Sequence, residues 1–169
     1  MKRIYLAGPD VFFSDALERA ALHKQMVREF GFEPLHPVDQ EKNDPASIYH
    51  LNIRLLNEAD AVVANIIPFR GAEMDTGTAF EIGYAVAQGL PVFTYRQYEG
   101  TVLETVREHY GPLVLDSASQ LWRDRNGALV EDFDLPCNLM VAVSTQFVQG
   151  SLVHALNELR RHFEVLEGR

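Results

Sequence analysis

The feature that most constrains the fold is the run AVVANII at residues 61–67, which is apolar at almost every position. A strand with one face in water alternates apolar and polar residues, whereas a strand covered on both faces is apolar throughout. The run is also far too short to span a membrane. It therefore predicts a central strand of a parallel sheet that has helices on both faces.

The segments around this run alternate between short strand patterns and longer helical patterns. Further strands are expected at Arg3–Gly8, Phe32–His36, Leu90–Tyr95 and Asn138–Val143. Helices are expected from a Ser14 cap through Phe30, from Pro45 through Glu58 behind an Asp44 cap, after the loop that follows Ile67, and over Thr101–His109 and Gln149–Leu166. This order predicts a three-layer, flavodoxin-like (Rossmann-like) α/β domain with a five-stranded, mainly parallel sheet.

The composition fits one ordinary globular domain, which we expect to cover residues 1–169. The net charge is -9 and no basic stripe is visible, so nucleic acid is not an expected partner. The single cysteine, Cys137, excludes an intrachain disulfide framework and a Cys-rich metal site. The first residues lack the long apolar core of a signal peptide, and no segment is long enough to cross a membrane. We expect a cytoplasmic protein that does not interact with membranes.

The loop and helix of residues 66–89 hold two carboxylates, Asp75 just before the helix and Glu81 in its first turns. Ligands of open α/β sheets bind at the carboxyl ends of the strands, where this loop must lie. Helical geometry places Glu81 on a face of small or polar residues, namely Gly77, Thr78, Tyr84, Ala85 and Gln88. We expect the opposite face, with Ala79, Ile82, Gly83 and Val86, to pack on the sheet.

Two interpretations of these carboxylates stay open on the residues alone. Glu81 is either an ionised, positioned nucleophile or a surface glutamate on an amphipathic helix that Asp75 caps. No phosphate-binding loop, dinucleotide motif, HExxH sequence or nucleophile elbow is present, so a metal or acyl-transfer site is not supported. A pair of acids without those motifs favours chemistry at a glycosidic bond. Apolar walls for a flat base are expected from Tyr5, Phe12, Phe13 and Met140.

Three motifs of the chain stand out together. The central motif runs from Phe69 to Gly83, the opening motif is Ile4–Pro9 with Phe12, and the third is Asn138–Met140 near the end. All three resemble motifs of one family, the nucleoside 2-deoxyribosyltransferases. The resemblance covers nearly the whole chain in the same order, and the central motif is the most specific of the three.

The resemblance implies roles for residues of this chain. Glu81 matches the nucleophile that forms a deoxyribosyl ester, Asp75 the acid that holds and protonates the base, and Tyr5 the tyrosine bonded to the nucleophile. Asn138 and Met140 match residues that enter the site of a neighbouring subunit, because the family forms oligomers built from dimers, commonly hexamers. The remaining residues expected to bind substrate are Gly8, Phe12, Gln40, Asn52 and Gly77, with Asn52 standing where some members have an aspartate.

The function that follows is transfer of 2-deoxyribose between nucleobases by a ping-pong mechanism through a deoxyribosyl-Glu81 intermediate, without cofactor or metal. One alternative is a nucleoside or nucleotide N-glycoside hydrolase on the same fold. Asp10 and Phe12–Phe13 follow the first strand, where a 5-phosphate would need basic groups, so an uncharged 5-hydroxyl is favoured. A non-catalytic nucleoside-binding module is the further alternative, which the Asp75 and Glu81 pair disfavours.

Overall fold

The computed structural model describes residues 1–38 and 44–168. Its centre is a five-stranded sheet in the order β2-β1-β3-β4-β7, in which every neighbouring pair is parallel. The strands are β1 (Arg3–Ala7), β2 (Glu33–Leu35), β3 (Ala61–Asn65), β4 (Val92–Arg96) and β7 (Gln146–Gln149). This confirms the flavodoxin-like arrangement that the alternation of elements predicts.

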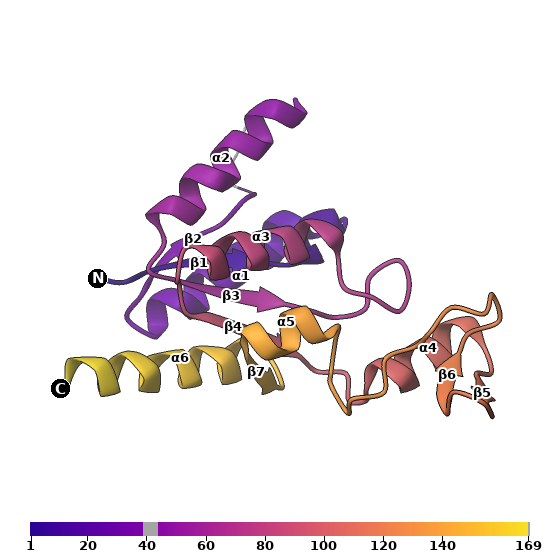
Figure 1. Ribbon diagram of the computed structural model, residues 1–169. Coiled ribbons are helices and arrows are strands. Elements are labelled where there is room, and N and C mark those ends of the chain that lie inside the picture. Colours follow the sequence, from indigo (N-terminus) through magenta and orange to yellow (C-terminus); the bar gives the residue numbers. More distant parts are fainter. Residues whose placement is uncertain (39–43, 169) are drawn as a thin grey trace.

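Helices cover both faces of the sheet (Figure 1). The long ones are α1 (Ala16–Glu29), α2 (Pro45–Glu58), α3 (Thr76–Ala87) and α6 (Leu152–Glu167), and the short ones are η1 (Pro9–Phe12), α4 (Val102–Tyr110) and α5 (Leu139–Ser144). Side chains of α1 and α6 pack on one face, whereas α2, α3 and α5 pack on the other. Because both faces are covered, β3 is buried at all five positions, as its apolar run predicts.

The end of the chain corrects two expectations. Residues 138–143 do not form the fifth strand: the Asn138 side chain accepts a hydrogen bond from the Met140 N–H (3.0 Å) and begins α5. The fifth strand is β7, which pairs with β4, and the last helix therefore begins at Leu152 behind Ser151 rather than at Gln149. A side-chain oxygen at a helix start accepts hydrogen bonds from backbone N–H groups that a strand would instead pair with a neighbouring strand. The Asn138 cap therefore favours a helix over a strand in this segment.

Other boundaries shift by only a few residues. The cap of α1 is Asp15 rather than Ser14, and Pro9–Phe12 form a short 3-10 helix where a loop is expected. The Asp44 cap of α2 is confirmed, since its carboxylate accepts from the Ser47 N–H at 2.9 Å.

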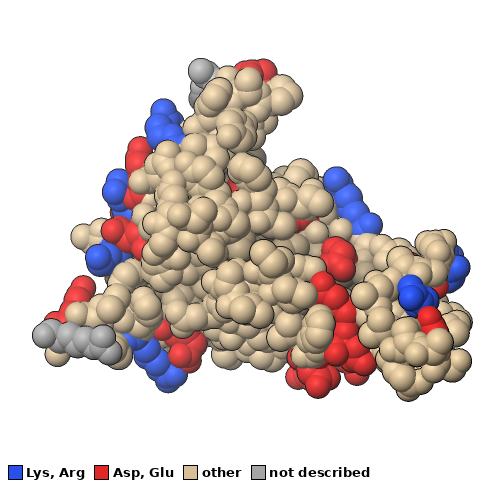
Figure 2. Space-filling model, in the orientation of Figure 1, with Lys and Arg blue, Asp and Glu red and all other residues tan. Residues whose placement is uncertain are grey.

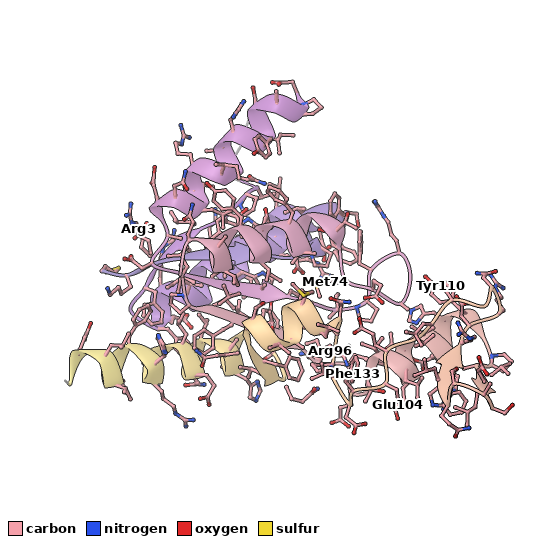
Figure 3. All side chains as sticks on the ribbon, viewed as in Figure 1. Arg3, Met74, Arg96, Glu104, Tyr110 and Phe133 are labelled. Carbon is pink, nitrogen blue, oxygen red and sulfur yellow. The ribbon has the colours of Figure 1, made fainter. Side chains whose placement is uncertain are left out.

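Residues 97–136 form an arm that lies beyond one end of the sheet (Figure 1). It carries α4 and an antiparallel hairpin of β5 (Val114–Asp116) and β6 (Leu121–Arg123). Tyr110, at the end of α4, accepts a hydrogen bond from the Ala72 N–H (3.3 Å) and so contacts the loop after β3 (Figure 3). The arm therefore braces the loop that leads to Asp75.

In the face shown in Figure 2, acidic side chains form a cluster between the body of the domain and the arm, while other Asp and Glu side chains and the Lys and Arg side chains are scattered along the outline. Within residues 1–38 and 44–168, no helix combines the length and the apolar character that a membrane span needs.

Candidate active site

A cavity of about 410 Å³ opens beside the carboxyl ends of β1 and β2, between α2 and the start of α3. It is lined by Gly8, Val11, Phe12, Pro37, Val38, Ile48, Asn52, Asp75, Gly77 and Glu81. Both carboxylates singled out in the sequence therefore border one space. This is the edge at which open α/β sheets bind ligands.

Glu81 is held by donors from two other elements. The Tyr5 hydroxyl, at the centre of β1, donates to Glu81 Oε1 at 2.6 Å, and Asn52 Nδ2 of α2 donates to the same oxygen at 3.3 Å. Both bonds use Oε1, so Oε2 is the carboxylate oxygen that neither donor occupies. Tyr5 is completely buried and acts behind Glu81 rather than as the cavity wall that was expected.

Burial, and to a smaller extent the charge of Asp75, raise the pKa of Glu81 from its ordinary value to about 7. The hydrogen bonds from Tyr5 and Asn52 act in the opposite direction, because they stabilise the ionised form. The pKa of the Tyr5 hydroxyl is strongly raised, first by burial and then by the Glu81 charge, so Tyr5 keeps its proton and stays a donor. Glu81 thus ionises near neutral pH, and the hydrogen bonds from Tyr5 and Asn52 hold its carboxylate in place.

Asp75 begins α3 and also borders the cavity. Its Oδ2 accepts hydrogen bonds from the Thr78 N–H (2.8 Å) and the Thr78 hydroxyl (2.9 Å), which makes it the N-cap. Among the described residues no donor bonds Oδ1. The two interpretations of Asp75 are therefore compatible, because one oxygen caps the helix while the other is left for a ligand.

The face of α3 that packs on the sheet differs from the expectation. Thr78, Ile82 and Ala85 are buried, whereas Gly83 and Phe80 are exposed. Thr78 and Ala85 therefore belong to the packed face and not to an open hollow around Glu81. Gly77 does line the cavity, and a β-carbon there would come within 3.1 Å of Asp75 Oδ2. Glu81 lies at the border of the packed face, and its carboxylate is therefore partly shielded from solvent.

An aromatic wall stands at the mouth of the cavity. The Phe12 ring lies 5.3 Å from the Phe69 ring, centroid to centroid, in a stacked arrangement. The Arg70 guanidinium lies over both rings, at 5.1 Å from Phe12 and 4.6 Å from Phe69. The Phe13 ring lies 6.3 Å from the Phe69 ring, centroid to centroid, in an edge-on arrangement. Phe13 does not line the cavity, although it was expected to form one of its walls.

Two expected substrate residues, Asn138 and Met140, are not brought to this cavity by their own chain. Asn138 Nδ2 donates to Glu131 Oε1 at 2.7 Å, and Met140 is 72% exposed on α5. Neither lines the cavity of its own chain. Gln40 lies outside the described residues.

Four cavity residues were not singled out as binding residues, namely Val11, Pro37, Val38 and Ile48. Ile48 and Asn52 are four residues apart on α2, so they share one helix face. That spacing is a usable signal for Ile48, although an apolar residue on a helix is equally typical of a face packed on a sheet. In the part of the chain that the structure describes, no group of three or more His, Cys, Asp or Glu side chains could hold a metal ion.

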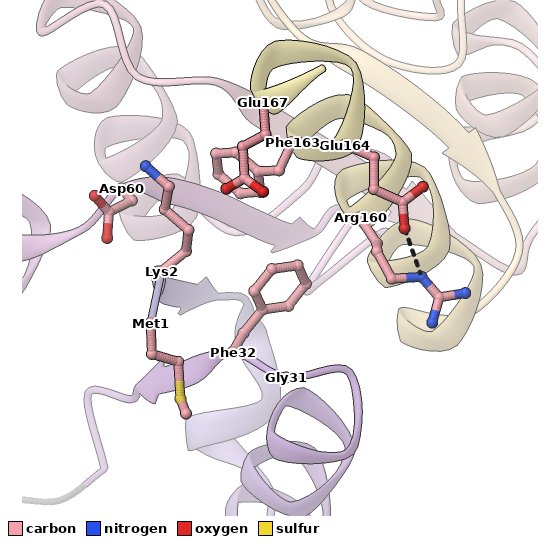
Figure 4. A pocket seen from close by; sticks show the side chains of 9 residues that line it. All are labelled: Met1, Lys2, Gly31, Phe32, Asp60, Arg160, Phe163, Glu164 and Glu167. Carbon is pink, nitrogen blue, oxygen red and sulfur yellow. Dashed lines mark ion pairs between the residues drawn. The ribbon is translucent and has the colours of Figure 1, made fainter.

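A second cavity, of about 440 Å³, lies at the opposite edge of the sheet (Figure 4). It is lined by Met1, Lys2, Gly31, Phe32, Asp60, Arg160, Phe163, Glu164 and Glu167. Lys2, Phe32 and Asp60 stand at the amino ends of β1, β2 and β3, so this cavity faces away from Glu81. An ion pair within this cavity joins Arg160 to Glu164 at 3.9 Å.

Comparison with known proteins places these features in a family. The family model of the nucleoside 2-deoxyribosyltransferases matches residues 4–140. The solved 2-deoxyribosyltransferase of Leishmania mexicana is 32% identical, covers 96% of this chain and 99% of its own, and superposes with a TM-score of 0.80. An uncharacterised protein of Schizosaccharomyces pombe is 28% identical over 81% of this chain and 74% of its own. A CMP N-glycosidase of Clostridium botulinum shares the fold, at 16% identity, 94% and 98% coverage and a TM-score of 0.51.

Proposed function

Because this chain belongs to the nucleoside 2-deoxyribosyltransferase family, we propose that it transfers 2-deoxyribose from one nucleobase to another through a covalent intermediate on Glu81. The observation that supports this most directly is the fixed glutamate beside the cap carboxylate. Tyr5 and Asn52 both hold Glu81 Oε1, and Asp75 borders the same cavity. A carboxylate fixed in this way needs little reorganisation before it attacks a sugar carbon.

In the first half-reaction, Glu81 Oε2 attacks C1 of the deoxyribose while the C1–N bond to the base breaks. The electron pair of that bond leaves with the base, and Asp75 Oδ1, which holds the one proton of the pair while Glu81 is ionised, delivers that proton to the ring nitrogen. Glu81 is then an ester and Asp75 a carboxylate. The hydrogen bond from the Tyr5 hydroxyl holds Oε1, which is now the carbonyl oxygen of the ester.

In the second half-reaction, another base enters the vacated side of the cavity. Asp75 takes a proton from its ring nitrogen, that nitrogen attacks C1, and the ester bond to Glu81 breaks with its electrons returning to the carboxylate. Two displacements at one carbon give net retention, so a β-nucleoside is rebuilt. No cofactor takes part in this scheme.

Chromatography of deoxyinosine incubated with free adenine tests the proposal. Formation of deoxyadenosine together with hypoxanthine means transfer. Release of hypoxanthine alone means that water is the acceptor and supports the hydrolase alternative, a chemistry for which the botulinum relative on this fold is named. Binding without any turnover would support the nucleoside-binding module.

We further propose that the active unit is a homo-oligomer built from dimers, in which Asn138 and Met140 complete the cavity of a neighbouring copy. Neither residue lines its own cavity, and α5 exposes Met140 (72%) and Val143 (77%). Met140 and Val143 lie three residues apart on α5 and so form a small apolar patch for a neighbouring copy to cover. The cytoplasmic location and the single-domain organisation expected from the sequence remain predictions alongside this one.

Mixing two inactive variants tests shared sites. Glu81→Gln removes the nucleophile, and Asn138→Ser keeps an oxygen that can cap α5 but removes the amide. If the sites are shared, hybrids hold some sites with both native residues, and the mixture regains activity that neither variant has. A mixture as inactive as its components, or a fully active monomer in analytical ultracentrifugation, would contradict the proposal.

A further inference from the structure

The segment Gly8–Val11 is a thin wall between two spaces. On one side, Gly8 and Val11 line the 410 Å³ active-site cavity. On the other side, Gly8, Asp10 and Val11 border a void of only about 10 Å³, which His23, His36 and Tyr95 also line. A void of this size is too small for a substrate. The polar groups around it therefore have a structural role in holding the segment Gly8–Val11 in place.

Asp10 is the buried anchor of this wall, with 8% of its surface exposed. Its Oδ2 accepts a hydrogen bond from Asn65 Nδ2 at 2.9 Å, and its Oδ1 pairs with Arg19 Nη1 at 3.4 Å. A buried carboxylate is costly unless such donors satisfy it. The proposed chemistry makes no use of Asp10 or Asn65.

Asn65 joins this anchor to a second loop. It is the last residue of β3, is 7% exposed, and its Oδ1 accepts from the Ile67 N–H at 3.3 Å. Ile67 begins the loop that ends at Asp75. One amide group therefore bridges the wall after β1 and the loop that carries the cap carboxylate.

Gly8 shows how close this contact is. Its φ is 154°, and a β-carbon there would lie 2.8 Å from Asn65 Cβ and 3.1 Å from Asp10 Oδ2. Further out, the stack of Phe12 on Phe69 joins the same two loops at the surface. The two loops are thus joined at two places, by the buried pair of Asp10 and Asn65 and, nearer the surface, by the stacked rings of Phe12 and Phe69.

We propose that Asp10 and Asn65 are a positioning pair, which fixes the distance between the two loops and so sets substrate affinity at the active-site cavity. The proposal rests on the function proposed for that cavity. Glu81 is held separately by Tyr5 and Asn52. Loss of the pair therefore raises KM for the nucleoside and leaves kcat nearly unchanged.

Exchanging the two side chains tests the pair. Asn65→Asp leaves an acceptor for the Ile67 N–H but sets two carboxylates against each other. Asp10→Asn keeps an acceptor for Asn65 but replaces a hydrogen bond to a charged carboxylate by a weaker neutral one, and it also loses the ion pair with Arg19. The double variant D10N/N65D rebuilds an amide–carboxylate pair with the donor on the other side. Asp116→Asn is the matched control, because Asp116 pairs with Arg123 (3.2 Å) in the hairpin of the arm.

We expect KM for deoxyinosine to rise about tenfold in Asn65→Asp and about threefold in Asp10→Asn, with kcat within about twofold, since directly contacting pairs couple by this order. KM in the double variant returns to within about threefold of the parent. Hydrogen exchange at residues 8–12 and at Ile67 rises in Asn65→Asp and returns in the double variant. Asp116→Asn changes none of these.

An unchanged KM in both single variants, or a double variant as impaired as Asn65→Asp, would overturn the proposal. If Asn65→Asp does not fold, Asp10→Asn and the double variant still decide it. Hydrogen exchange is measured without substrate, so it tests the contact between the two loops even if the native protein shows no transfer. That last outcome would count against the proposed function alone.

Discussion

The two cavities at opposite edges of the sheet have nearly the same volume, about 410 Å³ beside Glu81 and about 440 Å³ beside Arg160. They differ in how their polar groups are held. At the Glu81 edge, Tyr5 of β1 and Asn52 of α2 both donate hydrogen bonds to the side-chain oxygen Oε1 of Glu81 on α3. At the Arg160 edge, an ion pair joins neighbours on α6 whose side chains are 51% and 67% exposed.

The difference teaches that volume alone does not mark an active site. A parallel sheet sends its strand ends and the loops after them to one edge, so polar side chains from distant parts of the chain meet there. At the other edge the charged groups stay in solvent, where ion pairs contribute little. Function is therefore assigned to the edge at which side chains are buried and fixed.

The largest expected effect is the loss of transfer when Glu81 is replaced. Glu81→Gln keeps an oxygen for Tyr5 and Asn52 but cannot form the ester, so kcat should fall at least about a thousandfold. The matched control is Glu164→Gln in the opposite cavity, which should keep near-parental activity. Because Glu81 is partly buried, Gln is a better test than Ala, which would leave the Tyr5 hydroxyl without its acceptor. Near-full transfer in Glu81→Gln would contradict the assignment.

The second effect concerns the sugar. Glu81 is fixed from two sides and cannot move aside for a ribose 2-hydroxyl, and that hydroxyl also withdraws electrons from an oxocarbenium-like transition state. We expect kcat/KM for deoxyadenosine to exceed that for adenosine at least about a hundredfold with the same acceptor base. Equal values would remove the deoxyribosyl specificity even if Glu81 proved to be the nucleophile.

The third effect is a pH profile set by burial. The proposed first half-reaction needs one proton on the pair of Asp75 and Glu81, and the raised pKa of Glu81, about 7, means that the pair loses this proton above that pH. We expect kcat/KM to fall about tenfold for each pH unit above about 7. Asn52→Ala removes a hydrogen bond that lowers this pKa, so the midpoint should move to higher pH. A profile flat from about pH 5 to 8, or a midpoint that moves down in Asn52→Ala, would contradict this account.

The smallest effect is expected at the opposite cavity. Arg160→Ala removes the ion pair with Glu164 and the contact of the guanidinium with the Phe30 ring (5.2 Å). Exposed contacts of this kind contribute about 1 kcal/mol or less. Transfer activity should stay within about twofold, whereas a tenfold loss would show that this edge also takes part in function.

Much of the fold could be predicted because its signals are local. The apolar run of β3 and the Asp44 cap of α2 need only neighbouring residues, and both are confirmed. The mistaken strand at residues 138–143 shows the limit of such signals, because a short apolar run suits a strand or a buried helix equally. Only the Asn138 cap and the pairing of β7 with β4 decide between them.

The site was predicted less completely, since its contacts join distant segments. Tyr5 and Glu81 are 76 positions apart, and Asp10 and Asn65 are 55 apart. The motif resemblance identified Glu81, Asp75 and Tyr5, whereas nothing local indicated the pair of Asp10 and Asn65. Helical spacing also misplaced Thr78 and Ala85, because the sheet decides which face of α3 is buried.

Trapping the covalent intermediate tests the central claim most directly. The protein is mixed with deoxyinosine without an acceptor base, quenched in acid after a fraction of one turnover, digested and analysed by mass spectrometry. The account predicts one added deoxyribosyl group on the peptide that carries Glu81, lost when adenine is added before the quench and absent in Glu81→Gln. An adduct on another residue, or transfer without any adduct under these conditions, would contradict it.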